Sequence, residues 1–194
     1  MARTRIVGVF GGFVLLLASA ATPALKAEPS KPIETFTCFA ANLGTGKAGV
    51  IEIAINRWST DEEREMLLTT LQEFGQEKLL AALEKIRPPV GYMRTPNSIG
   101  YDLYYARNHP QPDGSRKVVL ATNRRVSFRE AANSTRSMQY QFTLIEIRID
   151  KNGKGEGKMV PAAKVSWDAK AKKIEVENYS ALPVDLVNVT AKTP

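Results

Sequence analysis

Short strand-like segments separated by turn residues constrain the fold of this chain most. Ile51, Ile53 and Ile55 alternate with less apolar residues, and a period of two places alternate side chains on opposite faces of a sheet. From Val90 onward no segment has helical periodicity, and apolar runs alternate with Gly, Pro, Asn and Asp turns. We therefore expect a largely antiparallel meander. Its predicted strands are Ile33–Ala41, Val50–Trp58, Ile99–Arg107, Lys117–Thr122, Ser137–Asp150, Lys158–Asp168, Lys173–Asn178 and Asp185–Thr190.

Between the second and third of these strands the apolar residues recur at helical spacing. Ser59 followed by Glu62 matches a capping box, which predicts a helix start. The apolar positions are Leu67, Leu68, Leu71 and Phe74, then Leu79, Leu80, Leu83 and Ile86. Because Gly75 is a typical helix end and Pro88 prevents continuation, we expect two short helices in a tight hairpin.

The longest predicted strand changes phase at Leu144–Ile145. Before this step the apolar face is Met138, Tyr140, Phe142 and Leu144, and after it the apolar face is Ile145, Ile147 and Ile149. A β-bulge would restore a single buried face and bend the strand, whereas a central strand could instead be buried on both sides. We favour the bend. The predicted fold is α+β: a curled antiparallel sheet, as a half-barrel or barrel-like meander, with the two-helix hairpin packed against it.

The N-terminus has the pattern of an export signal. Arg3 and Arg5 precede the uncharged run Ile6–Leu17 and then Ala18–Ala20. This run is shorter than the roughly 20 residues of a spanning helix, so we favour cleavage, after Ala20 or Ala27, over a retained membrane anchor. Residues 1–27 are thus predicted to be a signal peptide and residues 28–194 a single exported domain, periplasmic or extracellular, with no transmembrane segment after cleavage.

Charge and cysteine content exclude several classes. The formal net charge of +7 loses three positive charges with the signal, and the remainder forms no dense cationic stripe, so we expect no nucleic-acid partner. Cys38 is the only cysteine, so no intramolecular disulfide forms and the fold depends on its hydrophobic core.

Two loops resemble ion-binding motifs incompletely. Gly44–Lys47 has the end of a phosphate loop, but Ala48 stands where Ser or Thr is required. Asp150–Gly155 starts like a calcium loop, but Lys154 and Pro161 occupy ligand positions. We interpret both as turns and expect no metal and no cofactor.

Candidate catalytic residues are few. A hydrolase could use Cys38, or a serine, with His109, the only histidine, which requires that a strand and a loop meet. Glu175 and Glu177 share one strand face; we interpret them as the solvated side of a strand whose buried side is Ile174 and Val176.

One basic cluster is the candidate binding site. Arg124 and Arg125 precede an extended run in which Arg125 and Arg129 point the same way, a spacing that suits a carboxylate or phosphate. Tyr104, with its neighbours Tyr101 and Tyr105, could supply aromatic walls. The alternative is a solvated basic face beside core tyrosines.

Several segments together resemble a family of uncharacterised exported bacterial proteins with no assigned activity. These segments are Arg57–Arg64, Phe74–Gln76 with Leu79–Leu80, Val90–Tyr92, Ala121–Arg124, Tyr140–Thr143 and Gly153–Gly157. The resemblance implies one exported bacterial domain and transfers no site residue.

Together these features predict an exported, non-catalytic binding or envelope-interaction protein. Its ligand is expected to be small and anionic or amphiphilic, on the concave side of the sheet. The alternatives are the hydrolase above and a structural partner protein of the cell envelope, and the oligomeric state stays open.

Overall fold

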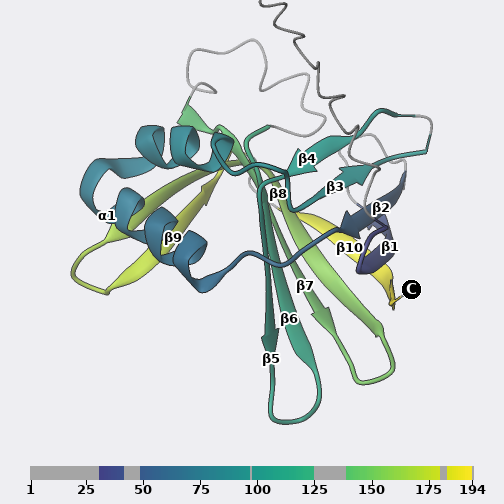
Figure 1. Cartoon of the computed structure of the whole chain (residues 1–194). Helices are drawn as coiled ribbons and strands as arrows, with labels where there is room; N and C mark the ends of the chain where they lie inside the picture. Colours follow the sequence, from purple (N-terminus) through teal and green to yellow (C-terminus); the bar gives the residue numbers. More distant parts are fainter. Residues whose placement is uncertain (1–30, 42–48, 97, 125–138, 180–182, 194) are drawn as a thin grey trace, which may run out of the picture.

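A computed structural model describes residues 31–41, 49–96, 98–124, 139–179 and 183–193. Within these ranges the chain forms ten strands and one helical element (Figure 1). In chain order they are β1 (Glu34–Ala41), β2 (Gly49–Ile55), α1 (Asp61–Glu84), β3 (Gly91–Arg94), β4 (Tyr101–Leu103), β5 (Tyr105–Pro110), β6 (Arg116–Thr122), β7 (Phe142–Ile149), β8 (Lys154–Asp168), β9 (Lys173–Asn178) and β10 (Val184–Lys192). The predicted signal peptide and the Gly44–Lys47 turn lie outside the described residues.

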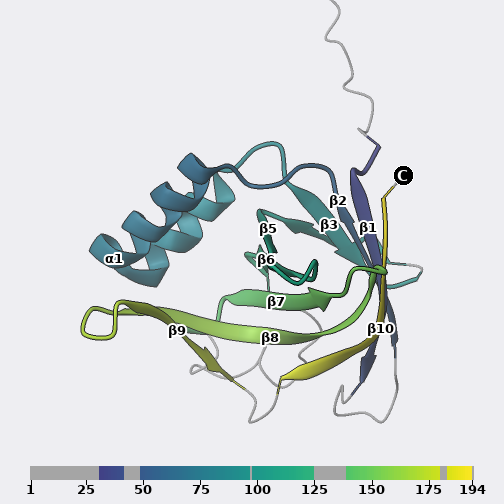
Figure 2. The same ribbon diagram turned by 90° about the horizontal axis from the view of Figure 1, so that it is seen from below.

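The strands form one sheet in the order β4-β3-β2-β1-β10-β8-β7-β6-β5, with β9 paired to β8 off this path. All of these pairings are antiparallel. Sequence neighbours pair from β5 to β9, as a meander requires, but the N-terminal β1 pairs with the C-terminal β10. The sheet curls strongly on itself, with α1 lying to one side above β8 and β9 (Figure 2).

The two ends of the sheet meet at Tyr104. β4 and β5 stand at opposite ends of the strand order, yet Tyr104 is the only residue between them in the chain. The Tyr104 N–H donates to the Ala121 carbonyl at 3.0 Å, and the Val90 N–H donates to the Leu103 carbonyl at 2.8 Å. Because one residue joins both edges, the edges must be adjacent, and the sheet is a nearly closed barrel.

The expected α+β fold with a two-helix hairpin is wrong. Asp61–Glu84 is one helical element, and the described chain is otherwise mostly strand, so the fold is mainly β. Gly75 has φ 76° and ψ −173° inside α1, a conformation that glycine adopts at little cost. No turn residues follow Gly75, so the helical hydrogen bonding resumes at once and the glycine kinks a single element. The predicted curl of the sheet is correct.

The helix start differs from prediction by one residue. Thr60 Oγ1 accepts from the Glu63 N–H at 3.1 Å, and a Glu63 carboxylate oxygen accepts from the Thr60 N–H at 3.0 Å, so these two residues form the capping box. Ser59, predicted to be the cap, is buried: its Oγ accepts from the Ala106 N–H at 3.0 Å and its own N–H donates to the Ala106 carbonyl at 2.7 Å. Ser59 therefore fastens the start of α1 to β5.

A register shift lies beside the predicted step, but the predicted bulge is not in β7. Between Phe142 and Leu144 of β7 the partners on β8 change from Ala163 to Val160, so the extra residue belongs to β8. β7 pairs with β6 without a register shift from Thr143 to Ile149. Thr143 and Ile145 are therefore buried on one face of β7 and Phe142 on the other, which is the alternative of a strand buried on both sides. The bulge in β8 is of the kind expected where a sheet closes into a barrel.

Two glycines allow β8 to curve tightly against β7. Gly155 pairs with Ile149 and Gly157 with Ile147. A Cβ atom at Gly155 would lie 1.8 Å from the Arg148 carbonyl oxygen, and one at Gly157 would lie 2.6 Å from the Glu146 carbonyl oxygen. No other residue fits such spacing, which is typical of glycine at a sharp bend of a barrel strand.

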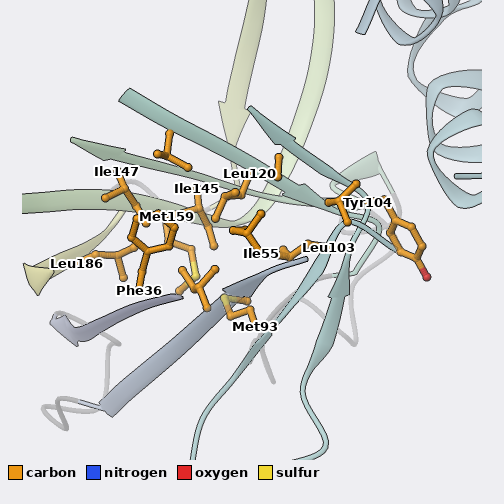
Figure 3. Close-up of a cluster of buried hydrophobic side chains, with 14 of the residues drawn as sticks. Phe36, Ile55, Met93, Leu103, Tyr104, Leu120, Ile145, Ile147, Met159 and Leu186 are labelled. Carbon is orange, nitrogen blue, oxygen red and sulfur yellow. The ribbon is translucent and has the colours of Figure 1, made fainter. Parts of the chain in front are cut away.

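Side chains fill the barrel interior (Figure 3). The largest fully buried side chains are Phe36, Ile53, Ile55, Met93, Leu103, Leu120, Phe142, Ile145, Ile147, Ile149, Met159 and Leu186. They come from strands all around the barrel and form one contiguous cluster. The concave side of the sheet is therefore a packed core across the described residues.

A buried ion pair crosses one end of the barrel. Arg116 Nη1 donates to Glu34 Oε2 at 2.8 Å, and Arg116 Nη2 donates to Glu34 Oε1. The Glu34 and Arg116 side chains are 8% and 22% exposed, and the guanidinium lies 5.7 Å from the centre of the Phe36 ring. Because three strands separate β1 from β6 in the sheet order, the pair bridges the barrel end and covers the apolar core.

Replacing Glu34 by Gln should lower the free energy of unfolding by about 3 kcal/mol, because Arg116 keeps a buried charge without its carboxylate. Urea denaturation measures this loss. The control is Glu52→Gln, which breaks the exposed Glu52–Arg94 pair, with side chains 46% and 47% exposed; it should cost less than about 1 kcal/mol. Equal losses in the two variants would contradict the structural role of the buried pair.

Candidate functional site

The predicted basic site is only partly described. Arg125 and Arg129 lie outside the described residues, so their role stays a prediction. Arg124 is exposed just after β6, and its carbonyl accepts from the Thr143 hydroxyl at 2.6 Å. Tyr104 is 6% exposed; its ring lies 4.9 Å from the Arg87 guanidinium carbon and its hydroxyl is 3.4 Å from Asp102. Tyr104 is thus part of the barrel closure, with little surface for a ligand.

The Cys38–His109 dyad is not assembled. Cys38 is fully buried on β1, and its thiol donates to the Ile51 carbonyl at a distance of 3.8 Å. Burial raises the pKa of this thiol to about 11. His109 lies on β5 opposite Lys117, and partial burial, followed by the charges of Lys117 and Arg107, lowers its pKa. A protonated thiol in the core is a poor nucleophile.

Cys38 should therefore not react with a chromogenic disulfide reagent at pH 8 in the native protein. A raised pKa leaves only about one thiol in a thousand ionised there, and burial blocks access. After unfolding in guanidinium chloride, one thiol per chain should react, since the sequence has one cysteine. Absorbance of the released thiolate measures both states. Rapid stoichiometric reaction of the native protein would contradict the burial of Cys38.

The calcium-like loop is the β7–β8 hairpin turn, as predicted. Asp150 Oδ1 accepts from the backbone N–H groups of Asn152 at 2.8 Å and Lys154 at 2.9 Å. These hydrogen bonds, the one from Lys154 first, lower the pKa of Asp150. The carboxylate thus stabilises its own turn. In the described part of the chain no three His, Cys, Asp or Glu side chains form a cluster that could hold a metal ion.

The predicted faces of β9 are half right. Glu175 and Glu177 are on the polar side, where Lys173 Nζ lies 3.6 Å from Glu175 and Lys164 Nζ lies 3.6 Å from Glu177. Glu177 also accepts from the hydroxyl of the buried Tyr140. Ile174 and Val176, predicted to be buried, are 50% and 46% exposed. One face of β9 is therefore polar, and the other is apolar but half exposed.

A groove of about 740 Å³ lies on the outer face of the barrel. Its lining includes the apolar residues Ala41, Val119, Leu144, Ile145, Val160, Val176, Leu186 and Val187 and the charged residues Glu146, Arg148, Glu156, Lys158 and Asp185. On β7, Leu144 and Glu146 alternate with the buried Ile145 and Ile147, so they point away from the core. Most of its lining comes from β6, β7, β8 and β10, which form a continuous part of the sheet, and Ala41 of β1 and Val176 of β9 complete it.

Four of the five charged side chains of the groove form ion pairs but stay accessible. Lys158 Nζ lies 2.9 Å from an Asp185 carboxylate oxygen, and Arg148 Nη2 lies 3.1 Å from a Glu146 carboxylate oxygen. The side chains of Lys158 and Arg148 are 66% and 74% exposed, and exposed ion pairs of this kind contribute little stability. The polar groups of a ligand can therefore replace Asp185 or Glu146 as partners of these cations at a small cost in free energy.

Sequence reasoning missed this groove. Leu144, Val160 and Val187 are apolar at positions where alternation puts the outer face, and that is the signal that could have indicated it. These residues come from β7, β8 and β10, and the pairing of β10 with β8 was not predictable from local pattern.

The fold and the groove define a small antiparallel barrel with a packed core and an amphiphilic outer face. Comparisons with protein-family models, with curated proteins and with solved structures found no match to this chain. Among the described residues no helix has the length and apolarity that crossing a bilayer requires.

Proposed function

We propose that this protein is an exported, non-catalytic binding domain that holds an amphiphilic ligand in the groove on the outer face of its barrel. The observation that carries the proposal is the groove itself, which combines apolar and charged side chains outside a core that is already filled. Export is supported by the pattern of residues 1–27.

The groove chemistry favours an amphiphile with a head group of mixed charge. Valine and leucine side chains offer an apolar surface, to which a hydrocarbon chain adds favourable burial. The lining holds two cationic residues, Arg148 and Lys158, and three carboxylates. A purely anionic group gains no net attraction there, whereas a zwitterionic head group can accept from Lys158 and lie beside Glu146 or Glu156.

A catalytic role has less support in the described residues. The only thiol is protonated in the core, and His109 has cationic neighbours. The groove lining contains no histidine, serine or cysteine, so it offers none of the residues of a serine or cysteine hydrolase. Binding therefore fits the groove better than hydrolysis.

Dodecylphosphocholine, below its critical micelle concentration, should raise the melting temperature of the protein, and phosphocholine without the chain should not. Val187→Glu, at a groove residue 38% exposed, should weaken binding about tenfold, or about 1.4 kcal/mol, because a carboxylate then faces the hydrocarbon chain. Calorimetric titration measures the affinity.

The matched control is Met66→Glu on α1, where the wild-type side chain is 42% exposed and outside this groove; it should bind as the wild type does. The proposal would be contradicted if the amphiphile did not change the melting temperature. It would also be contradicted if both variants bound the amphiphile equally weakly, because the groove would then not be the binding site.

A further inference from the structure

An apolar surface continues from the groove across β1 to β2. Val187 of β10 lines the groove and lies opposite Phe39 of β1 in the strand register, and Phe39 lies opposite Val50 of β2. Their chain neighbours Cys38 and Leu186 are fully buried, so Phe39 and Val187 point away from the core, and they are 41% and 38% exposed. Opposite side chains on one face are about 5 Å apart. Val187, Phe39 and Val50 therefore form one apolar patch, which we call the β1 arm.

A second apolar patch lies within the groove on β7 and β8. Leu144 of β7 lies opposite Val160 of β8, and both line the groove. Both are half-buried, whereas their chain neighbours Ile145 and Met159 are buried in the core. We call this pair the β7 arm. Its side chains are less exposed than Phe39 of the β1 arm.

A charged strip separates the two arms. Asp185 of β10 lies opposite Lys158 of β8, and Lys158 lies opposite Glu146 of β7, so the sign of the charge alternates across three strands. Lys158 Nζ lies 2.9 Å from an Asp185 carboxylate oxygen. Because β10 and β8 are antiparallel, Val187 and Val160, each two residues further along its strand, lie on opposite sides of this pair. One arm therefore lies on each side of the strip.

We propose that the ligand is an amphiphile with two hydrocarbon chains on one zwitterionic head group, such as a diacyl phospholipid. This inference rests on the proposed function and specifies the class of its ligand. The head group lies on the charged strip, one chain lies on the β1 arm, and the other lies on the β7 arm. A single chain that covered both arms would cross the strip, where it would take charged side chains out of water.

The second chain adds affinity because the head group holds it beside its own arm. Each chain is stabilised by covering apolar side chains that are otherwise in contact with water. A one-chain amphiphile fills only one arm, and the greater exposure of Phe39 and Val187 favours the β1 arm. Once the first chain and the head group are bound, the second chain binds at a high effective concentration. A two-chain amphiphile should therefore bind more tightly than a one-chain amphiphile of similar hydrophobicity.

Calorimetric titration with two phosphocholines tests the number of chains. Dodecylphosphocholine has one chain, and diheptanoylphosphatidylcholine has two short chains and a similar critical micelle concentration. Below that concentration the wild type should bind the two-chain compound about tenfold more tightly or better. Equal affinity for the two compounds would overturn this inference and leave the proposed function intact, whereas binding of neither compound would overturn both.

Variants in the two arms test where the chains lie. Phe39→Ser and Leu144→Ser should each weaken binding of the two-chain compound about tenfold, because each removes a large apolar side chain from one arm. Val160→Thr keeps the shape of the side chain and should also weaken binding, which tests the β7 arm in a variant expected to keep its fold. The melting curve of each variant shows whether it is folded.

The matched control is Phe74→Ser on α1, at a side chain 64% exposed and outside both arms. This variant should bind both compounds as the wild type does. The two-chain arrangement would be overturned if folded variants of only one arm weakened binding of the two-chain compound. It would also be overturned if Phe74→Ser weakened this binding as much as the arm variants do.

Discussion

The structure depends on the passage of the chain from one edge of the sheet to the other through Tyr104 alone. Because β4 and β5 are consecutive in the chain and terminal in the strand order, the sheet must close around its own concave face. The backbone groups along this seam are bonded at Val90, Tyr104 and Ala106. Closure leaves the sheet only short or covered edges at this seam. It also encloses most of the core, to which Leu67, Leu71 and Leu83 of α1 are added.

Closure also determines where function can lie. The interior is filled with aliphatic and aromatic side chains, and the Glu34–Arg116 pair covers one end. The groove lies on the outside, mainly on β6, β7, β8 and β10, and combines apolar and charged groups. β8 continues beyond its pairing with β7 and β10 to pair with β9, whose Val176 also lines the groove.

Local structure was predictable where the pattern of apolar residues within one segment determines it. Alternation of Ile51, Ile53 and Ile55 predicted a strand with a buried face. The phase change in β7 was misinterpreted, because β7 is buried on both faces near Phe142 and the bulge lies in β8. The predicted number of helices was wrong because a glycine with positive φ, such as Gly75, can either end a helix or kink it. Which of the two occurs depends on the residues that follow. Ser59 was taken as the cap because its bond to Ala106 of β5 is a tertiary contact that local pattern does not reveal.

Long-range features were not predictable from local pattern. The pairing of β1 with β10 joins residues more than a hundred positions apart. The groove depends on the pairing of β10 with β8, which brings Val187 beside the lining residues of β7 and β8. Of the predicted binding residues, Tyr104 is buried where the two edges of the sheet meet, and Arg124 is exposed. Glu34 and Arg116, which cross the barrel, carried no sequence signal because charged residues at strand ends are usually solvated.

Hydrogen exchange at the seam tests the closed barrel most directly. If the barrel is closed, the amides of Tyr104 and Ala106 should exchange as slowly as those of central strand residues such as Leu120 and Ile147, because the same global opening exposes them all. Exchange of the Tyr104 and Ala106 amides at the rate of the exposed β5–β6 turn would show that the seam is open and would contradict the account.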